Sequence, residues 1–181
     1  MTRLRDTALR IVFFSFVFGF FCFEARTYEL KTGIALGPGI RTDEFENLDD
    51  VFFSLGLHAS LLWGRDDGGH WAGGPHFFFI SDDFSNVGAG LGASVLLPVS
   101  DDYPFELSCG PMYRKDPGEI HAAGIAARLW WGMLKKNMQD IYSGSIGIFI
   151  ESRIDVYGED GRFFILGIEF DGLTILGPLW I

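Results

Sequence analysis

The sequence predicts an all-β fold, a closed antiparallel up-and-down β-barrel of about eight strands. From Tyr28 onward, hydrophobic residues alternate with small or polar ones, and a period of two is the pattern of strands. The composition agrees, because 19 Phe and 24 Gly among 181 residues are typical of β-structure. Short polar segments separate the alternating runs, as hairpin connections do.

Eight alternating runs can be delimited, and no segment after residue 25 repeats its hydrophobic residues at the period of a helix. Neither a linker nor a second domain is visible, so residues 26–181 are expected to form one barrel domain. The predicted strands are Tyr28–Thr42, Val51–Gly64, His76–Asp82, Val87–Val99, Tyr103–Arg114, Ile120–Leu134, Ile141–Val156 and Arg162–Asp171.

Residues 1–25 differ from the rest of the chain. Arg3, Arg5 and Arg10 precede a hydrophobic run of 13 residues, Ile11–Phe23. A helix that spans a bilayer needs about 20 residues, whereas the hydrophobic region of a secretory signal peptide has about 7–15. The sequence therefore predicts a cleaved signal peptide over residues 1–25, with Ala25 before the cleavage site and a retained anchor as the alternative.

Charge and cysteine content limit the partners of the exported chain. Without residues 1–25 it holds 11 basic and 22 acidic residues, a net charge of −11, and an acidic chain repels the phosphates of nucleic acid. Cys109 is then the one cysteine left, so the exported chain cannot form an internal disulfide.

The glycines at positions 88, 90 and 92 suggest a phosphate-binding loop at first sight. A dinucleotide fingerprint requires a strand-to-helix turn and a G-x-G-x-x-G spacing. Here Gly88, Gly90 and Gly92 alternate with Val87, Ala89 and Leu91 inside a strand pattern. We therefore expect no nucleotide and interpret these glycines as one face of a barrel strand.

Each predicted strand has one hydrophobic face and one face of small, polar or charged residues. In a soluble barrel the hydrophobic face points inward, and in an outer-membrane barrel it points to lipid. The abundance of glycine on the polar face favours the second architecture, because the interior of a narrow barrel has little room.

Aromatic residues also favour a transmembrane barrel. The ten Trp and Tyr residues, Trp130 among them, lie near predicted strand ends or in the adjoining loops and tail. That is the distribution of aromatic girdles at the two interfaces of a membrane. The predicted girdle contains Tyr28, Trp63, Tyr103, Tyr113, Trp131 and Tyr142.

The signal peptide, the eight amphipathic strands and the polar interior resemble the small eight-stranded outer-membrane β-barrels of Gram-negative bacteria, over about residues 26–173. The resemblance is one of pattern. It implies a place in the bacterial outer membrane, with membrane lipids and lipopolysaccharide as partners and any protein partner left open. The family ends its last strand on a terminal aromatic residue, a position for Phe170 here, and has short turns where this chain has the connection Arg65–Pro75.

The polar face carries charges of both signs, as burial demands, because an unpaired buried charge is strongly unfavourable. Side chains can fill the interior of an eight-stranded barrel, so we expect a salt-bridged plug and keep a narrow pore or a ligand cavity as the alternative. The predicted interior network comprises Glu29, Lys31, Arg41, Glu106, Arg128, Glu151, Arg153 and Glu169, with Arg114, Asp155 and Asp171 on the same face.

His58 and Ser60 are the candidate catalytic residues. They lie two residues apart on one strand face, where a histidine could activate a serine. The pair resembles the His-x-Ser element of outer-membrane lipid A deacylases, which implies acyl hydrolysis. In that family the element lies late in the chain and Asn follows it, whereas Leu61 follows here, and no acidic partner can be assigned. We expect polar filling of the interior and no catalysis.

The sequence has five acidic pairs, and nearly all of them lie at predicted turns, where Asp is favoured for its own sake. None of these turns has the spacing of a calcium motif, and His70, His76 and His121 lack the spacing of metal ligands, so we expect no metal and no cofactor. The pairs are Asp49-Asp50, Asp66-Asp67, Asp82-Asp83, Asp101-Asp102 and Glu159-Asp160.

Taken together, the sequence predicts an outer-membrane β-barrel with a structural or surface-interaction role and a polar, largely plugged interior. Two alternatives stay open. One is a soluble periplasmic barrel that binds lipid in a hydrophobic lumen. The other is a membrane-embedded acyl hydrolase that uses His58 and Ser60.

Overall fold

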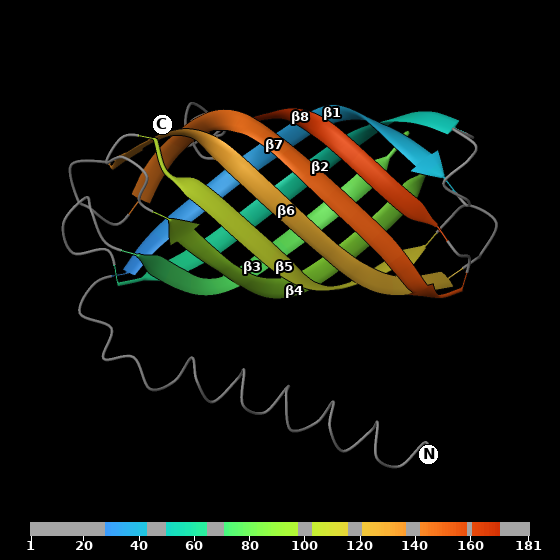
Figure 1. The fold of residues 1–181 in the computed structure, drawn as a ribbon, viewed down its shortest axis with the longest axis horizontal. Coiled ribbons are helices and arrows are strands. Elements are labelled where there is room, and N and C mark those ends of the chain that lie inside the picture. Colours follow the sequence, from blue (N-terminus) through green and yellow to red (C-terminus); the bar gives the residue numbers. More distant parts are fainter. Residues whose placement is uncertain are drawn as a thin grey trace, which may run out of the picture.

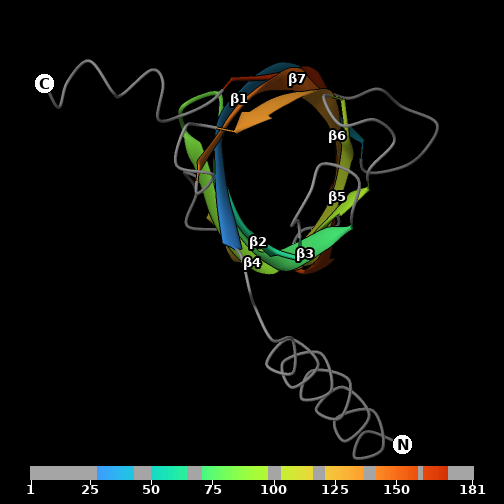
Figure 2. The ribbon, with the colours of Figure 1, turned by 90° about the vertical axis from the view of Figure 1, so that its left-hand side faces the viewer.

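The computed structural model describes residues 28–42, 50–64, 71–97, 103–115, 121–136, 142–158 and 161–170. Eight antiparallel strands within these ranges form one closed barrel, in which β8 returns to β1 (Figures 1 and 2). The strands are β1 (Tyr28–Thr42), β2 (Asp50–Trp63), β3 (Ala72–Asp82), β4 (Asn86–Leu97), β5 (Phe105–Lys115), β6 (His121–Lys136), β7 (Tyr142–Tyr157) and β8 (Arg162–Phe170).

The predicted all-β, closed, eight-stranded antiparallel fold is confirmed. Within the described ranges, no helix is long and apolar enough to cross a membrane. The predicted signal peptide over residues 1–25 and the tail after Gly172 lie outside the described residues.

Strand β3 is the one element whose predicted start is wrong by more than two residues. It begins at Ala72 and not at His76, so the connection from β2 covers residues 64–71 and is shorter than expected. The run Gly73-Gly74-Pro75 reads as a turn because glycine and proline punctuate local structure. In the barrel, Pro75 pairs with Ala93 of β4. The pairing of β2 with β3 is interrupted at this residue, because proline has no N–H to donate.

All eight strands turn their hydrophobic faces outward and their small, polar faces into the lumen. Leu57, Leu91, Ile150 and Leu166 are 50–58% exposed on the outer surface, whereas Glu106 on the lumen face is 3% exposed. Of the two orientations that the alternation allows, the structure therefore has the one with the apolar side chains outside.

Glycines face one another across neighbouring strands at three places in the lumen wall. A Cβ at Gly132 would lie 2.2 Å from the carbonyl oxygen of Ile146, and a Cβ at Gly92 would lie 2.2 Å from that of Cys109. Only glycine permits such tight curvature without a shift of the backbone. The facing pairs are Gly92 with Gly110, Gly132 with Gly147, and Gly37 with Gly167.

Hydrophobic side chains close the lumen toward the end where β1 begins, which we call the first end; the second end is the one where β1 terminates. Trp130 belongs to this closure and is 1% exposed, which corrects its expected position near the membrane interface. Trp130 and Trp131 are consecutive in β6, so one points into the lumen and the other outward. The closing residues are Leu62, Ala72, Leu96, Trp130 and Leu134.

Strand β8 is too short to cover β1 along its whole length. It has 9 residues against 15 in β1, and the pairing of the two strands runs from Thr42 only as far as Ile34. Nearer the first end, Leu30 and Lys31 pair in parallel with the first two residues of β7. The barrel is therefore closed there by direct contact between β1 and β7.

The glycine contacts generate the first prediction. Gly132→Ala should destabilise the barrel by about 1–3 kcal/mol, because the new methyl group overlaps the backbone of β7. Gly73→Ala is the matched control, because a Cβ there would lie 3.3 Å from its nearest neighbour, the carbonyl oxygen of Ser94. Urea unfolding followed by circular dichroism measures both, and equal stabilities of the two variants would contradict the prediction.

Candidate functional site

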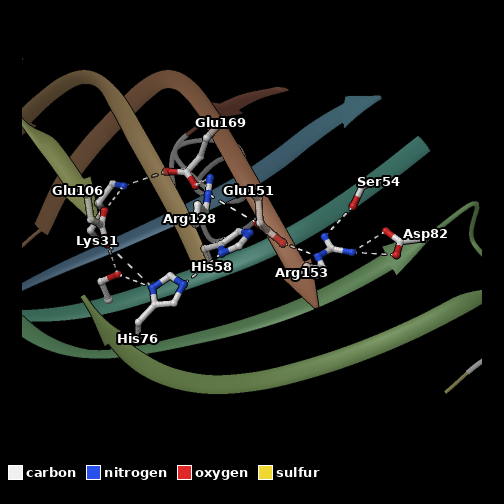
Figure 3. A network of polar contacts seen from close by, with 11 residues as sticks. Lys31, Ser54, His58, His76, Asp82, Glu106, Arg128, Glu151, Arg153 and Glu169 are labelled. Carbon is white, nitrogen blue, oxygen red and sulfur yellow. Dashed lines mark hydrogen bonds and ion pairs between the residues drawn. The ribbon is translucent and has the colours of Figure 1, made fainter. Parts of the chain in front are cut away.

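Charged side chains from six strands meet in the middle of the lumen (Figure 3). They form one continuous chain of ion pairs, which we call the lumen network. Each of these side chains is at most 5% exposed. In order along the chain of contacts, the members are Asp82, Arg153, Glu151, Arg128, Glu169, Lys31 and Glu106.

Lys31 of β1 joins two carboxylates at one end of the network. Its Nζ lies 2.5 Å from Oε2 of Glu106 and 3.0 Å from Oε1 of Glu169. The same ammonium group sits 3.7 Å from the ring centroid of Trp130, a cation–π contact. One cation therefore compensates charges from β5 and β8 and also packs against the hydrophobic closure of the first end.

Arg153 of β7 organises the other end. Its Nη1 donates to both carboxylate oxygens of Asp82, at 3.0 and 2.8 Å, and its Nη2 donates to Ser54 at 3.0 Å. Its Nε donates to Oε1 of Glu151 at 2.5 Å. A planar guanidinium with several fixed donors suits such a site, because each hydrogen bond offsets part of the cost of burying the charge.

Arg128 of β6 joins the two ends. It forms an ion pair with Glu169, and its Nε lies 3.9 Å from Oε2 of Glu151. Its guanidinium carbon is 4.3 Å from the ring centroid of Phe149, so an aromatic face also covers this charge. Six of the eight predicted interior residues therefore meet in one network.

The other predicted interior charges also face the lumen, nearer the ends. Glu29 is 2% exposed, and the guanidinium of Arg41 lies 5.6 Å from the ring centroid of Phe163. Arg114 forms a second ion pair with Asp155, at 2.7 Å. Asp171 lies outside the described residues.

Asp82 is a member of the network that sequence reasoning missed. It was expected to be a solvated turn residue beside Asp83, but it is 3% exposed and accepts two hydrogen bonds from Arg153. Asp82 is the last residue of β3, and the alternation that turns His76 and Ile80 inward also turns Asp82 inward. Extending that alternation up to the turn would have placed it correctly.

His58 and Ser60 lie on the lumen face of β2, but the hydroxyl of Ser60 bonds a histidine of the neighbouring strand. Ser60 Oγ is 2.8 Å from Nδ1 of His76 and donates to Oε1 of Glu106 at 2.7 Å. Nδ1 of His58 lies 3.4 Å from Nε2 of His76, and the two rings are stacked. Sequence analysis considered His76 only as a metal ligand and missed its contact with Ser60, because the two residues are 16 positions apart and are brought together by strand register.

This arrangement differs from that of a hydrolytic triad. In a triad the histidine contacts the serine through one ring nitrogen and the carboxylate through the other. Here Ser60 and Glu106 both lie on the Nδ1 side of His76, with Oε1 of Glu106 at 4.0 Å, and Nε2 faces His58. The four side chains therefore form a hydrogen-bonded relay that ends on a carboxylate.

The cavity beside this relay is small. It has a volume of about 10 Å³, roughly the space of one water molecule, and His58, His76, Ser108 and Arg128 contribute to its lining. Among the described residues, no group of three or more His, Cys, Asp or Glu side chains could hold a metal ion. The centre of the lumen is thus packed with side chains and ion pairs.

The residues of the predicted girdle lie toward the two ends of the barrel. Tyr103 and Trp131 are 50% and 44% exposed near the first end, where Trp63 is half-buried, and Tyr113 is 52% exposed near the second end. The ring of Trp131 stacks on that of Phe105. Tyr28 and Tyr142 are the first residues of β1 and β7, at the first end.

A scan of protein-family models and a search of curated proteins each found no match. Its function must therefore be inferred from the chemistry of the lumen and of the outer surface.

The lumen network generates the second prediction. Lys31→Met should destabilise the fold by about 3–5 kcal/mol, because it leaves the carboxylates of Glu106 and Glu169 buried without their shared cation. Lys115→Met is the control, since Lys115 is exposed at the end of β5 and a surface charge contributes about 1 kcal/mol or less. Urea unfolding measures the difference. A Lys31→Met variant as stable as the control would mean that the network is not required for the fold.

Proposed function

We propose that this protein is an integral β-barrel of the bacterial outer membrane, with a structural or surface-interaction role and a lumen closed by ion pairs. The observation that carries the proposal is the outer surface. Among the side chains that the structure describes, no outward position between the two rims is Asp, Glu, Lys, Arg or His, and Lys115, His121 and Arg162 stand at strand ends of the second end. Soluble monomers rarely expose so continuous an apolar surface.

The outer surface forms a band around the barrel. Its residues are half or nearly half exposed and come from successive strands. They include Leu57, Phe77, Phe79, Leu91, Leu107, Ile125, Leu129, Ile148, Ile150, Leu166 and Ile168. Strands of 9–16 residues are long enough to cross a bilayer, since a tilted strand needs about 9–11. The aromatic residues toward both ends fit the interfaces on either side of such a band.

The lumen supports a role without transport through the barrel. Ion pairs fill its centre, and hydrophobic side chains cover it at the first end. A soluble carrier of lipid would need a hollow, apolar interior, and a hydrolase would need space for a substrate beside Ser60. Neither requirement fits a central cavity of about 10 Å³.

Extraction and gel mobility test the proposal on envelope fractions from cells that make the full-length protein. We expect extraction only with detergent and different mobilities for the unboiled and the boiled chain, because a closed barrel resists unfolding by detergent alone. Release as a soluble protein without detergent would overturn the proposal and make the lipid-binding barrel the leading alternative.

A charge placed on the outer band provides the third prediction. In phosphatidylcholine vesicles, Ile150→Arg should destabilise the barrel by about 2–4 kcal/mol, as expected for a charge near the middle of a bilayer. Ile150 is central in β7 and 56% exposed. Val156→Arg, at the second end of the same strand, should cost about 0–1 kcal/mol. Equal unfolding midpoints in urea for the two variants would contradict a membrane-facing band.

A further inference from the structure

The turn between β3 and β4 carries an unusual residue. Asp83 and Phe84 both have positive φ angles, 50° and 57°, and the backbone N–H of Ser85 donates to the carbonyl of Asp82 at 3.1 Å. Two consecutive positive φ angles are the mark of a type I′ turn, in which Asp-Gly and Asn-Gly are preferred because they tolerate this conformation. A bulky aromatic residue is disfavoured there. A glycine after Asp83 would suit the turn better than the phenylalanine that the chain has.

Two hydrogen bonds hold this strained turn against the barrel wall. The backbone N–H of Asp83 donates to the carbonyl of Phe53, and the N–H of Phe53 donates to Oδ1 of Asp83, both at 2.8 Å. Phe53 lies three residues inside the start of β2 at Asp50. These bonds continue the pairing of β2 with β3 up to the turn, and β2 extends three residues further toward the second end. Several backbone polar groups of the turn are therefore already bonded.

This arrangement presents Phe84 to the surroundings of the barrel. Its ring stacks on that of Phe53 with centroids 6.2 Å apart, and it is 74% exposed. Val51, on the same outward face of β2, is 79% exposed. The three residues form an apolar patch, the β3–β4 patch, which continues the outer band at the second end.

We propose that the β3–β4 turn lies in the interfacial region of the bilayer and that Phe84 inserts into lipid as an anchor. The inference rests on the proposed membrane location and adds a specific occupant for the patch. Strained residues persist where the surrounding structure imposes them, and they gather at functional positions. The patch is continuous with the band that faces lipid in the proposal, and the backbone N–H groups of Asp83 and Ser85 are already bonded, so lipid is the partner that fits it.

Depth-dependent quenching tests this inference. The full chain is folded into phosphatidylcholine vesicles in which the lipids carry bromine either near the headgroup or near the bilayer centre. Phe84→Trp adds a fluorophore at the patch, and Leu91→Trp adds one at an exposed mid-band position of β4; the fluorescence of the parent protein is subtracted from each. We expect the added signal at 84 to be quenched more by bromine near the headgroup, and the signal at 91 more by bromine near the centre.

The two positions separate failure of the inference from failure of the proposed function. Quenching at 91 without quenching at 84 would leave the membrane barrel intact and overturn the anchor, and a protein partner would then be the next candidate for the patch. Absence of quenching at both positions would overturn the membrane barrel itself.

The thermal midpoint of unfolding of a Phe84→Gly variant provides a second test, because a role in the turn alone and a role as a lipid anchor predict shifts in opposite directions. If residue 84 serves only the turn, glycine relieves the backbone strain and raises the thermal midpoint of unfolding in vesicles. We expect a lower midpoint, because the loss of lipid contact outweighs that relief. A midpoint that is unchanged or higher would overturn the anchor.

Discussion

Compensation of buried charge is the constraint on which the rest of this structure depends. Alternation along each strand turns a fixed set of side chains into a lumen too narrow to hydrate them, and several of those side chains are charged. They are tolerable only in contact with opposite charges. Backbone hydrogen bonds join each strand to its neighbours in the sheet. The lumen network also joins strands that are not adjacent, such as β3 with β7 and β1 with β5. It therefore braces the cross-section of the barrel as well as filling it.

Glycines and bulky residues share the rest of the lumen between them. Where large side chains such as Trp130, Phe149 and Phe78 reach across, the wall beside them is glycine: the ring of Trp130 lies over Gly147 and that of Phe78 over Gly90. The glycines that suggest a nucleotide-binding loop in the sequence thus leave room into which side chains of the neighbouring strand pack. Curvature of the sheet and filling of the interior have the same origin in these positions.

The architecture could be predicted from the sequence because it follows from local alternation. Each strand shows its period independently, and the parity of a residue decides whether it faces the lumen. Parity alone predicts that Lys31 and Arg128 point inward, where both side chains are buried. The errors arose where a decision depends on neighbouring strands. The partner of Ser60 is His76, which only the register between β2 and β3 reveals. Residue type and position near a strand end predict that Trp130 lies at an interface and that Asp82 is solvated. The parity of each residue along its strand instead points it into the lumen, where both are buried.

The membrane location and the role at the cell surface stay predictions.

The shortness of β8 bears on how the barrel closes during folding. All pairings but those of β1 with β8 and with β7 join strands that follow one another in sequence, so successive hairpins can form from nearby segments. The first and last strands are separated by more than a hundred residues, and bringing them together carries the largest loss of chain entropy. Because β8 has only nine residues, few backbone hydrogen bonds to β1 offset this loss of entropy. The parallel pairing of β1 with β7 adds further contacts. The β1–β8 line therefore combines the largest entropic cost of pairing in the barrel with a short run of paired residues to offset it.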